Sequence, residues 1–447
     1  MKNHLPVAIF ILCVLLNTSY ITGQTDSTYQ KEGFTLGVLP AISFDADLGF
    51  QYGALTNLYW YGDGSRYPDY EHSLYAEASR YTAGSTLLRF YYDSPTAIKN
   101  IRTTADITWF RDLAMDFYGF NGYDAQYNSA WEDSKSDDYK SRVFYRHHRD
   151  MFRILTNFKG RIGGLDSPFE WIGGLVMFKF DIKSVDIDRL NKRNKKDDKL
   201  PDIDGLYEKY LDWNIISKEE AEGGIHSYLK GGLSYDTRNV LNNPSQGMWS
   251  EAFLSYMPSF LSSQTSSYLR LNLFHRQYFS FTPKKSFILA YRIGWQHKIT
   301  GDIPFYLLPH FASSALTSAT SQGFGGAKTL RGINRNRVVG DGGVLANFEA
   351  RWKMWRSKLF KQDFYLASNY FIDMGWISQK YEIDKSLVPD DEYAMFFNDD
   401  KEKPHWSYGL GLKAALNENF VLSADYGFAL DRQDGTSGLY ITLNYLF

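Results

Sequence analysis

Apolar and polar side chains alternate with a period of two residues along most of this chain, and this pattern constrains the fold more than any other feature of the sequence. Residues 438–447 carry an apolar side chain at every second position, and residues 419–430 and 343–355 repeat the pattern. Successive side chains of a β-strand point to opposite faces, so these segments are predicted to be strands with one apolar and one polar face. Helical periodicity is almost absent after residue 34, and the fold class is therefore predicted to be all-β.

The length and the tips of these segments distinguish two classes of β protein. A soluble β-sandwich also alternates, but its polar faces point outward to water around a thin core. Here the segments run for about 10 to 15 residues, carry many arginines on the polar face and end in Trp or Tyr. We therefore predict a transmembrane antiparallel β-barrel with a wet interior. A secreted β-sandwich or β-propeller is the alternative.

About sixteen such segments can be counted between residue 34 and residue 447. Single-chain bacterial barrels have an even number of strands, as this count does. If the first strand runs outward, the long connections all fall on the outer side, at about 113–149, 184–223, 300–342 and 379–404. This agreement supports the topology and predicts that the C-terminus faces the inner side of the membrane.

The first residues have the layout of a secretory signal peptide. An apolar stretch at 5–16 follows Lys2 and precedes small and polar residues. Cys13 is the one cysteine of the chain and lies inside this stretch, so the mature protein is expected to have neither disulfides nor thiol chemistry. We expect three parts, which are a signal peptide at 1–23, a short periplasmic segment at 24–33 and an outer-membrane β-barrel at 34–447.

The sequence contains none of the common catalytic or cofactor-binding motifs. It has no GxSxG elbow, HExxH helix, phosphate-binding loop or CxxC pair. His147 and His148 are adjacent, so in a strand they would face opposite ways and could not bind one ion together. We therefore predict a protein that is not an enzyme, with no catalytic residue, no cofactor and no metal site. The net charge of −2 gives no sign of nucleic-acid binding.

One loop segment and two carboxylates form the candidate functional site. Glu349 and Asp373 are predicted on the polar faces of successive strands, so both carboxylates would face the lumen and need a cation. Arg331 lies in the glycine-containing segment 325–334, in the long connection before the strand of Glu349. Its planar guanidinium can bond two carboxylates at once if the loop folds inward. The alternative is that Arg331 is an ordinary loop arginine; Arg335 and Arg337 nearby are expected to be solvated.

Several short motifs of this sequence occur in the order seen in a known family. They are Tyr235–Arg238, Asn243–Gly247, Leu330–Ile333, Asn347–Arg351, Phe371–Gly375 and Tyr408–Leu412, followed by the terminal Phe447. In these motifs the chain resembles the outer-membrane-protein-85 superfamily, also called the bacterial surface antigen family, which includes the barrel-assembly translocase. The resemblance covers the whole mature chain.

The resemblance implies a sixteen-stranded barrel with an inward-folded loop before strand 12. It also implies that Arg331 of the segment Leu330, Arg331, Gly332 and Ile333 contacts Glu349 and Asp373, and that Phe447 is the C-terminal signal of the barrel. Two departures stand out. Ile333 replaces the aromatic residue that usually follows the Arg-Gly pair. About ten residues separate the expected cleavage site from the first strand, so we expect a barrel without periplasmic polypeptide-transport-associated repeats.

These observations predict a transport or assembly component of the bacterial outer membrane. Its expected partners are outer-membrane lipids and lipopolysaccharide, with other outer-membrane or periplasmic subunits as further candidates. The barrel-assembly machinery is expected to insert it, and no nucleic acid is expected to bind. The alternatives are a passive or gated pore and a surface-loop binding protein that is anchored by the barrel.

The pore alternative depends on the charges predicted to face the lumen. The cations predicted there are Arg89, Arg102, Arg153, Lys159, Arg161, Lys230, Arg270, Arg276, Arg292 and Lys298. They outnumber the predicted lumen carboxylates, which are Glu77, Asp106, Asp181, Glu251 and Asp425. A pore of this composition is expected to prefer anions.

Overall fold

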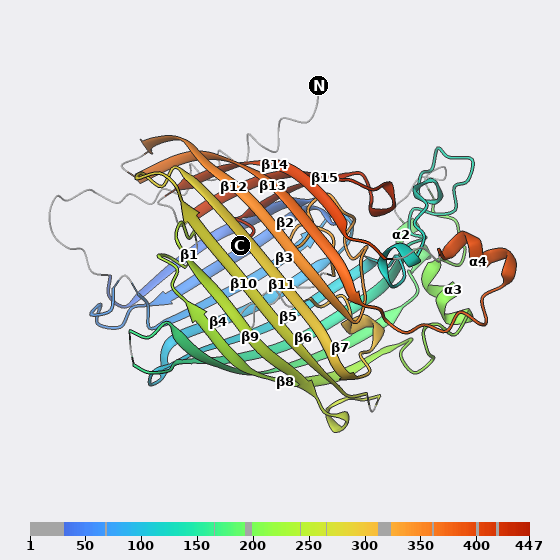
Figure 1. The fold of residues 1–447 in the computed structure, drawn as a ribbon, viewed down its shortest axis with the longest axis horizontal. Helices are drawn as coiled ribbons and strands as arrows, with labels where there is room; N and C mark the ends of the chain where they lie inside the picture. Colours follow the sequence, from blue (N-terminus) through green and yellow to red (C-terminus); the bar gives the residue numbers. More distant parts are fainter. Residues whose placement is uncertain are drawn as a thin grey trace.

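Antiparallel strands follow one another around a closed barrel, each hydrogen-bonded to the strands before and after it in the sequence (Figure 1). The computed structural model describes residues 31–67, 69–164, 166–192, 199–241, 243–264, 266–311, 323–359, 362–398, 402–416 and 420–447. Within these residues the barrel has sixteen strands, so the predicted fold class is confirmed. The predicted signal peptide at 1–23, and most of the segment predicted at 24–33, lie outside the described residues.

The strands and helices have the following bounds. The strands are β1 (Phe34–Asp45), β2 (Gly49–Trp60), β3 (His72–Tyr81), β4 (Thr86–Ile98), β5 (Ile101–Asp116), β6 (Arg146–Arg161), β7 (Phe169–Lys183), β8 (Gly223–Asp236), β9 (Gly247–Met257), β10 (Tyr268–Ser280), β11 (Phe287–Gly301), β12 (Gly342–Leu359), β13 (Gln362–Gln379), β14 (His405–Leu416), β15 (Phe420–Ala429) and β16 (Ser437–Leu443). The short helices are α2 (Ile187–Asn191), α3 (Leu206–Asp212) and α4 (Asp390–Phe396). Within the described residues, no helix combines the length and apolar character needed to cross a membrane.

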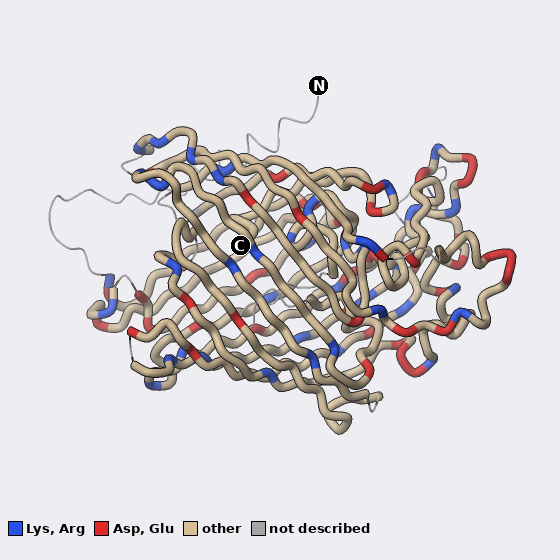
Figure 2. Tube along the Cα trace, viewed as in Figure 1, with Lys and Arg blue, Asp and Glu red and all other residues tan. Residues whose placement is uncertain are grey.

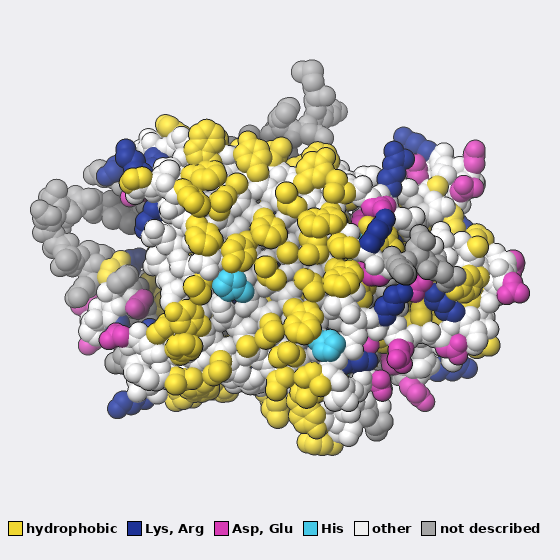
Figure 3. Space-filling model, viewed as in Figure 1, with side chains coloured by type: hydrophobic (Ala, Val, Ile, Leu, Met, Phe, Trp, Pro, Cys, Tyr) yellow, Lys and Arg dark blue, Asp and Glu magenta, His cyan; other side chains and the backbone are white. Residues whose placement is uncertain are grey.

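The two faces of each strand differ as the alternation predicts. On β12, Phe348 and Trp352 are exposed on the outside, whereas Asn347, Glu349 and Arg351 are buried on the inside. Hydrophobic side chains cover much of the outer surface of the strands in the view of Figure 3. Charged residues are found both along the strands and in the connections at the two ends (Figure 2). The outer surface is thus suited to lipid, and the charges of the strands face mainly inward.

The long connections lie at one end of the barrel, which we call the loop end (Figure 1). They join β5 to β6, β7 to β8, β11 to β12 and β13 to β14, and they carry the three helices. Their aromatic side chains pack together, with ring centroids 5.3 Å apart for Phe117 and Tyr210, 4.7 Å for Phe120 and Tyr381, and 5.2 Å for Trp131 and Phe396. These rings belong to the largest cluster of buried apolar residues, which we call the aromatic cap, except for Tyr381, which is partly buried and packs against it.

The aromatic cap explains one wrong prediction. Asp181 was predicted to face the lumen, but it is opposite Asp150 of β6, while its neighbours Phe180 and Ile182 are buried. Near the loop end the inner face of β7 packs against the aromatic cap and is therefore apolar. The buried residues of β7 keep one parity along the strand, and Asp181 lies on the opposite, outer face.

Strands β1 and β16 are joined by only two residue pairs, Phe44 with Ile441 and Asp45 with Tyr440. Each of the other neighbouring pairs of strands is joined by seven or more pairs in the described residues. We call the β1–β16 junction the seam. Residues 34–43 of β1 pair with β2 but not with β16. Within the described residues, the edge of β1 over residues 34–43 therefore has no strand partner on this side.

The C-terminal residues leave the sheet earlier than predicted. The last strand was expected at 438–447, but β16 ends at Leu443, and Asn444 adopts a left-handed conformation with φ of 67°. The guanidinium carbon of Arg351 lies 4.3 Å from the centre of the Tyr445 ring, and Arg351 Nη2 donates to the carbonyl oxygen of Phe447 at 2.8 Å. The left-handed turn and these contacts with an inward-facing arginine direct the tail away from β1.

We expect the purified protein to be heat-modifiable on an SDS gel. Almost every strand is hydrogen-bonded on both sides, so detergent finds few unpaired backbone groups until heat separates the strands. The measurement is the shift in mobility between unheated and boiled samples, together with a β-sheet circular-dichroism spectrum. One mobility at both temperatures, or a helical spectrum, would contradict the fold.

Candidate functional site

The connection between β11 and β12 brings the candidate arginine to the strands. Residues 323–341 of this connection form what we call the arginine loop. Thr329 Oγ1 accepts from the amide of Gly325 at 3.0 Å and donates to the carbonyl oxygen of Gly323 at 3.1 Å, which ties the start of the loop into a tight turn. Gly325 and Gly326 both have positive φ, at 119° and 83°, a conformation that glycine adopts without strain.

Arg331 binds carboxylates on two neighbouring strands. Its Nη1 donates to Glu349 Oε1 of β12 at 2.7 Å, while its Nε and Nη2 donate to Asp373 of β13 at 2.9 and 3.0 Å. The backbone amide of Arg331 also donates to Asp373 Oδ2 at 3.1 Å. The ring of Phe371 lies beneath the guanidinium, with its centre 3.5 Å from the guanidinium carbon. The forked contact that the sequence suggested is therefore present in the structure.

Two further cations and one further carboxylate adjoin this contact. Arg351 Nε donates to Glu349 Oε2 at 2.8 Å, and Lys413 Nζ donates to Asp425 Oδ1 at 2.7 Å. Asp425 Oδ2 lies 3.6 Å from Arg331 Nη1, so it joins the two pairs. The group, which we call the ion cluster, consists of Arg331, Arg351, Lys413, Glu349, Asp373 and Asp425.

The side chains of the ion cluster are almost fully buried, and their charges balance. Burial alone would lower the pKa of Arg331, but Asp373, Glu349 and Asp425 raise it above its ordinary value. Arg331 is therefore charged at any physiological pH. Because each carboxylate has a cation within reach, the cluster satisfies charges that would be costly to bury singly.

The residues next to Arg331 fit the loop closely against the strands. Gly332 has φ of 96°, and a Cβ atom there would lie 2.5 Å from the carbonyl carbon of Gly427 on β15. Its amide donates to Tyr440 Oη of β16 at 3.1 Å. Leu330 and Ile333 are fully buried in an apolar cluster with neighbours from the strands. Ile333 thus packs as a core residue at the position where the family that the motifs resemble usually has an aromatic one.

The structure brings the predicted loop and strand residues into one network. Leu330, Arg331, Gly332, Ile333, Glu349 and Asp373 lie together, and Phe447 joins them through its contact with Arg351. The functional role of these residues stays a prediction. Asn347 was missed as a site residue although alternation places it inward; its Nδ2 donates to Asp373 Oδ1 at 2.8 Å.

The expectation that Arg335 and Arg337 are solvated is wrong. Arg335 Nε donates to Asp116 Oδ2 at 2.6 Å and its Nη2 to Asp112 Oδ2 at 2.8 Å, both on β5. Arg337 donates to backbone carbonyl oxygens, including those of Gly122 and Ala125, both at 2.9 Å. These partners lie more than two hundred residues away in the sequence, so no local pattern could have revealed them.

Many of the predicted lumen cations are paired with carboxylates. Arg89 and Arg153 both contact Asp106, at 2.6 and 3.0 Å. Further pairs join Arg276 to Glu251 and Lys298 to Asp341, at 3.2 and 2.6 Å. Pairing on the inner wall lowers the field that a mobile ion would meet in the lumen.

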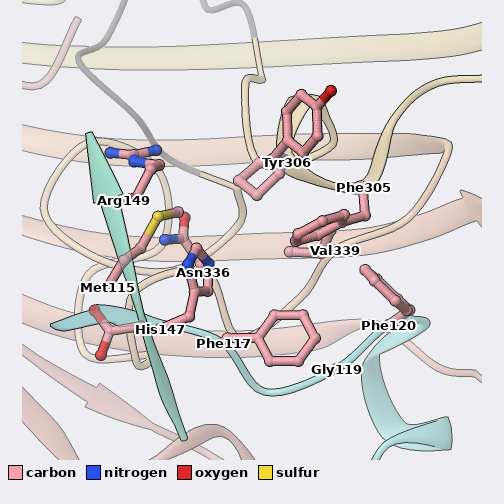
Figure 4. A pocket seen from close by; sticks show the side chains of 12 residues that line it. Met115, Phe117, Gly119, Phe120, His147, Arg149, Phe305, Tyr306, Asn336 and Val339 are labelled. Carbon is pink, nitrogen blue, oxygen red and sulfur yellow. The ribbon is translucent and has the colours of Figure 1, made fainter. Parts of the chain in front are cut away.

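A small hollow lies at the loop end, beside the aromatic cap. Phe117, Phe120 and Phe305 line one part of it, and His147, Arg149 and Asn336 another (Figure 4). Within the residues that the structure describes, no group of three or more His, Cys, Asp or Glu side chains is placed to hold a metal ion.

The closed antiparallel barrel and its loop arginine define a class of outer-membrane barrel, and the comparisons identify the family. Residues 72–447 match the model of the Omp85 superfamily domain, so the chain belongs to the Omp85 superfamily. The resemblance inferred from the motifs is confirmed. A search of curated proteins finds no match.

Solved structures share the fold at low sequence identity. The crystal structure of BamA from Haemophilus ducreyi lacking POTRA domains 1–3 has a TM-score of 0.54 and 14% identity, over 93% of this chain and 70% of that chain. CdiB from Escherichia coli has a TM-score of 0.54 and 10% identity, over 94% of this chain and 64% of that chain. At these identities the likeness shows the fold alone.

We expect Arg331→Ala to lower the free energy of unfolding by roughly 3 to 5 kcal/mol, because it leaves the carboxylates of Glu349 and Asp373 buried without their shared cation. Arg66→Ala, at an exposed residue of the β2–β3 connection, is the control and should change it by about 0.5 kcal/mol or less. Arg331→Lys should rescue only part of the loss, since an ammonium cannot make the forked contact. The measurement is urea unfolding in lipid vesicles, followed by tryptophan fluorescence.

The double mutant tests the partnership directly. Arg331→Ala combined with Asp373→Asn should cost less than the sum of the two single changes, since the second change removes a charge that the first leaves unpaired. Additive losses, or equal behaviour of Arg331→Ala and Arg66→Ala, would show that the ion cluster does not stabilise the barrel.

Proposed function

We propose that this protein is an outer-membrane barrel that transports or assembles other proteins, and that client strands are received at the seam. Membership of the Omp85 superfamily supports the general role. The observation that carries the proposal is the seam, where only two residue pairs join β1 to β16. An edge with free backbone groups is the surface on which another chain can add a strand.

The chemistry of the seam suits a strand as its ligand. In an antiparallel sheet, alternate residues direct their N–H and C=O groups to one side, so about half of residues 34–43 point toward the missing partner. Unpaired backbone groups are costly in lipid, at several kcal/mol each. Leu36 and Val38 on this stretch are exposed, which gives an incoming strand apolar contacts as well.

The C-terminal tail leaves this edge of β1 uncovered. If residues 444–447 continued β16, they would extend alongside β1. Instead Asn444, whose amide still bonds the carbonyl oxygen of Val421 on β15 at 2.7 Å, turns the chain with a left-handed φ of 67°, and Tyr445 and Phe447 lie against Arg351. The inward turn of the tail therefore keeps the seam short.

We also propose that the arginine loop folds into the lumen and that Leu330, Arg331, Gly332 and Ile333 hold it there. The burial of Arg331 and its bonds to Glu349 and Asp373, which project from the inner faces of β12 and β13, support this placement. Such a loop stabilises the wall of the barrel and narrows the lumen at once.

The proposed location is the outer membrane, with the loop end outside and a cleaved signal peptide at 1–23. Proposed partners are the lipids and lipopolysaccharide of that membrane, other envelope subunits, and the barrel-assembly machinery that inserts the protein. The apolar outer face of the strands supports this location.

We expect a disulfide across the seam to abolish function. Phe44→Cys with Ile441→Cys places two thiols at paired positions, where Cβ atoms of antiparallel partners lie about 4.5 to 5.5 Å apart. Leu254→Cys with Leu271→Cys, which are paired on β9 and β10, is the matched control. The measurement is the level of other outer-membrane proteins in cells that depend on each variant, with and without reductant.

The seam variant should deplete outer-membrane proteins until reductant is added, and the control should not. Normal levels with a fully formed seam disulfide would overturn the proposed function.

A gated pore is the second candidate, and the polar inner wall is the observation that favours it. Among the residues that the sequence predicted to face the lumen, cations still outnumber carboxylates after Asp181 is removed. We expect a low conductance in planar bilayers, because the arginine loop narrows the lumen, and a preference for anions in whatever current remains. A large, steady, cation-selective current from the intact chain would contradict both expectations.

A further inference from the structure

The arginine loop contacts both sides of the seam. On one side, the amide of Gly332 donates to Tyr440 Oη of β16, and Tyr440 is the residue opposite Asp45 of β1. On the other side, Asp47 in the connection that follows β1 accepts from the amide of Arg335 at 3.5 Å. Loop residues 332–335 therefore lie beside the seam and reach across it.

The side chain of Arg335 binds the wall on the β1 side of the seam. Its guanidinium bonds Asp112 and Asp116 of β5, and it is only 2% exposed. Asp112 Oδ1 also accepts from Ser85 Oγ at 3.0 Å, in the connection between β3 and β4. Through Arg335 the loop is thus joined to β5 and, by way of Asp112, to the connection between β3 and β4.

Arg331 and Arg335 bind strands on opposite sides of the seam. Arg331 binds the strands that lead to the seam from one direction, through Glu349, Asp373 and Asp425 on β12, β13 and β15. Arg335 binds the strands that leave it in the other direction, through Asp112 and Asp116. Because β16 and β1 are neighbours in the closed ring, a loop held at both points bridges the junction from inside.

We propose that Arg335 is a positioning residue that holds the seam closed, acting as a second anchor of the arginine loop opposite Arg331. The inference rests on the proposed function, since it assigns a control to the seam at which client strands are received. With both anchors bound, two residue pairs are enough to keep β1 beside β16. When Arg335 is released, the loop stays on β12 and β13 while β1 and β2 are free to move away from β16.

Hydrogen exchange of the full chain in lipid vesicles tests the anchor. Arg335→Ala removes at least two hydrogen bonds to charged groups, so exchange in peptides from β1 and β16 should rise by about tenfold or more, with β8 and β9 unchanged. Arg276→Ala is the matched control, because Arg276 is also buried and ion-paired. Arg276 lies on β10 and its partner Glu251 on β9, away from the seam. This variant should raise exchange near β9 and β10 only.

A second variant keeps the test decisive if Arg335→Ala does not fold. Asp47→Asn weakens the contact at the seam and leaves the bonds of Arg335 to β5 in place, so it should raise exchange in β1 by a few-fold without affecting β5. Unchanged exchange in β1 and β16 in both variants would overturn the proposal. An equal rise over all strands in Arg335→Ala, with none in Asp47→Asn, would also overturn it, since it would show a general loss of stability.

The seam disulfide separates this inference from the proposed function. In Arg335→Ala, the thiols of Phe44→Cys and Ile441→Cys should form a disulfide several-fold more slowly than in the parent, because the strands are apart more of the time. One outcome is that the disulfide forms more slowly in Arg335→Ala while the seam disulfide in the parent leaves the other outer-membrane proteins at normal levels. That result would support the role of Arg335 as an anchor and overturn the proposed function. Equal rates in both backgrounds would overturn the anchor.

Discussion

Two carboxylates that face each other on neighbouring strands need a shared cation, and Arg331 supplies it. Glu349 and Asp373 project inward from β12 and β13, where two like charges would repel each other in a partly dehydrated wall. Four hydrogen bonds from Arg331 neutralise them. Since Arg331 belongs to a connection and not to a strand, this requirement also fixes where the arginine loop lies.

The arginine loop contacts strands and connections from several parts of the barrel. Gly332 can approach β15 closely only because it has no Cβ, and its amide reaches Tyr440 on β16. Arg335, four residues after Arg331, binds a second pair of carboxylates, on β5. Arg337 then joins the loop to the connection between β5 and β6 at the loop end. Three arginines of one segment thus tie together strands and connections that are distant in the sequence.

The wall of the barrel has one short junction, and contacts in the interior account for its length. In the part of the chain that the structure describes, fifteen of the sixteen strand pairs are joined by seven or more residue pairs, whereas the seam has two. The tail that would lengthen the seam is bound to Arg351, which is itself held by Glu349 of the ion cluster. The same buried charges therefore stabilise the loop and keep the tail away from β1.

The sequence by itself determined the fold, since a period of two residues is a local property of the backbone that needs no knowledge of distant contacts. It placed most strands to within a few residues, such as 267–280 for β10, and it paired Arg331 with Glu349 and Asp373 by assigning faces to strands. It failed where a side chain's environment comes from elsewhere in the chain. Asp181 points outward because the aromatic cap packs inside, and the tail turns inward because Arg351 binds it. Arg335 is buried because β5 offers it two carboxylates, and the seam is short because the tail has left it. These features arise from contacts between distant segments, which only the tertiary structure decides.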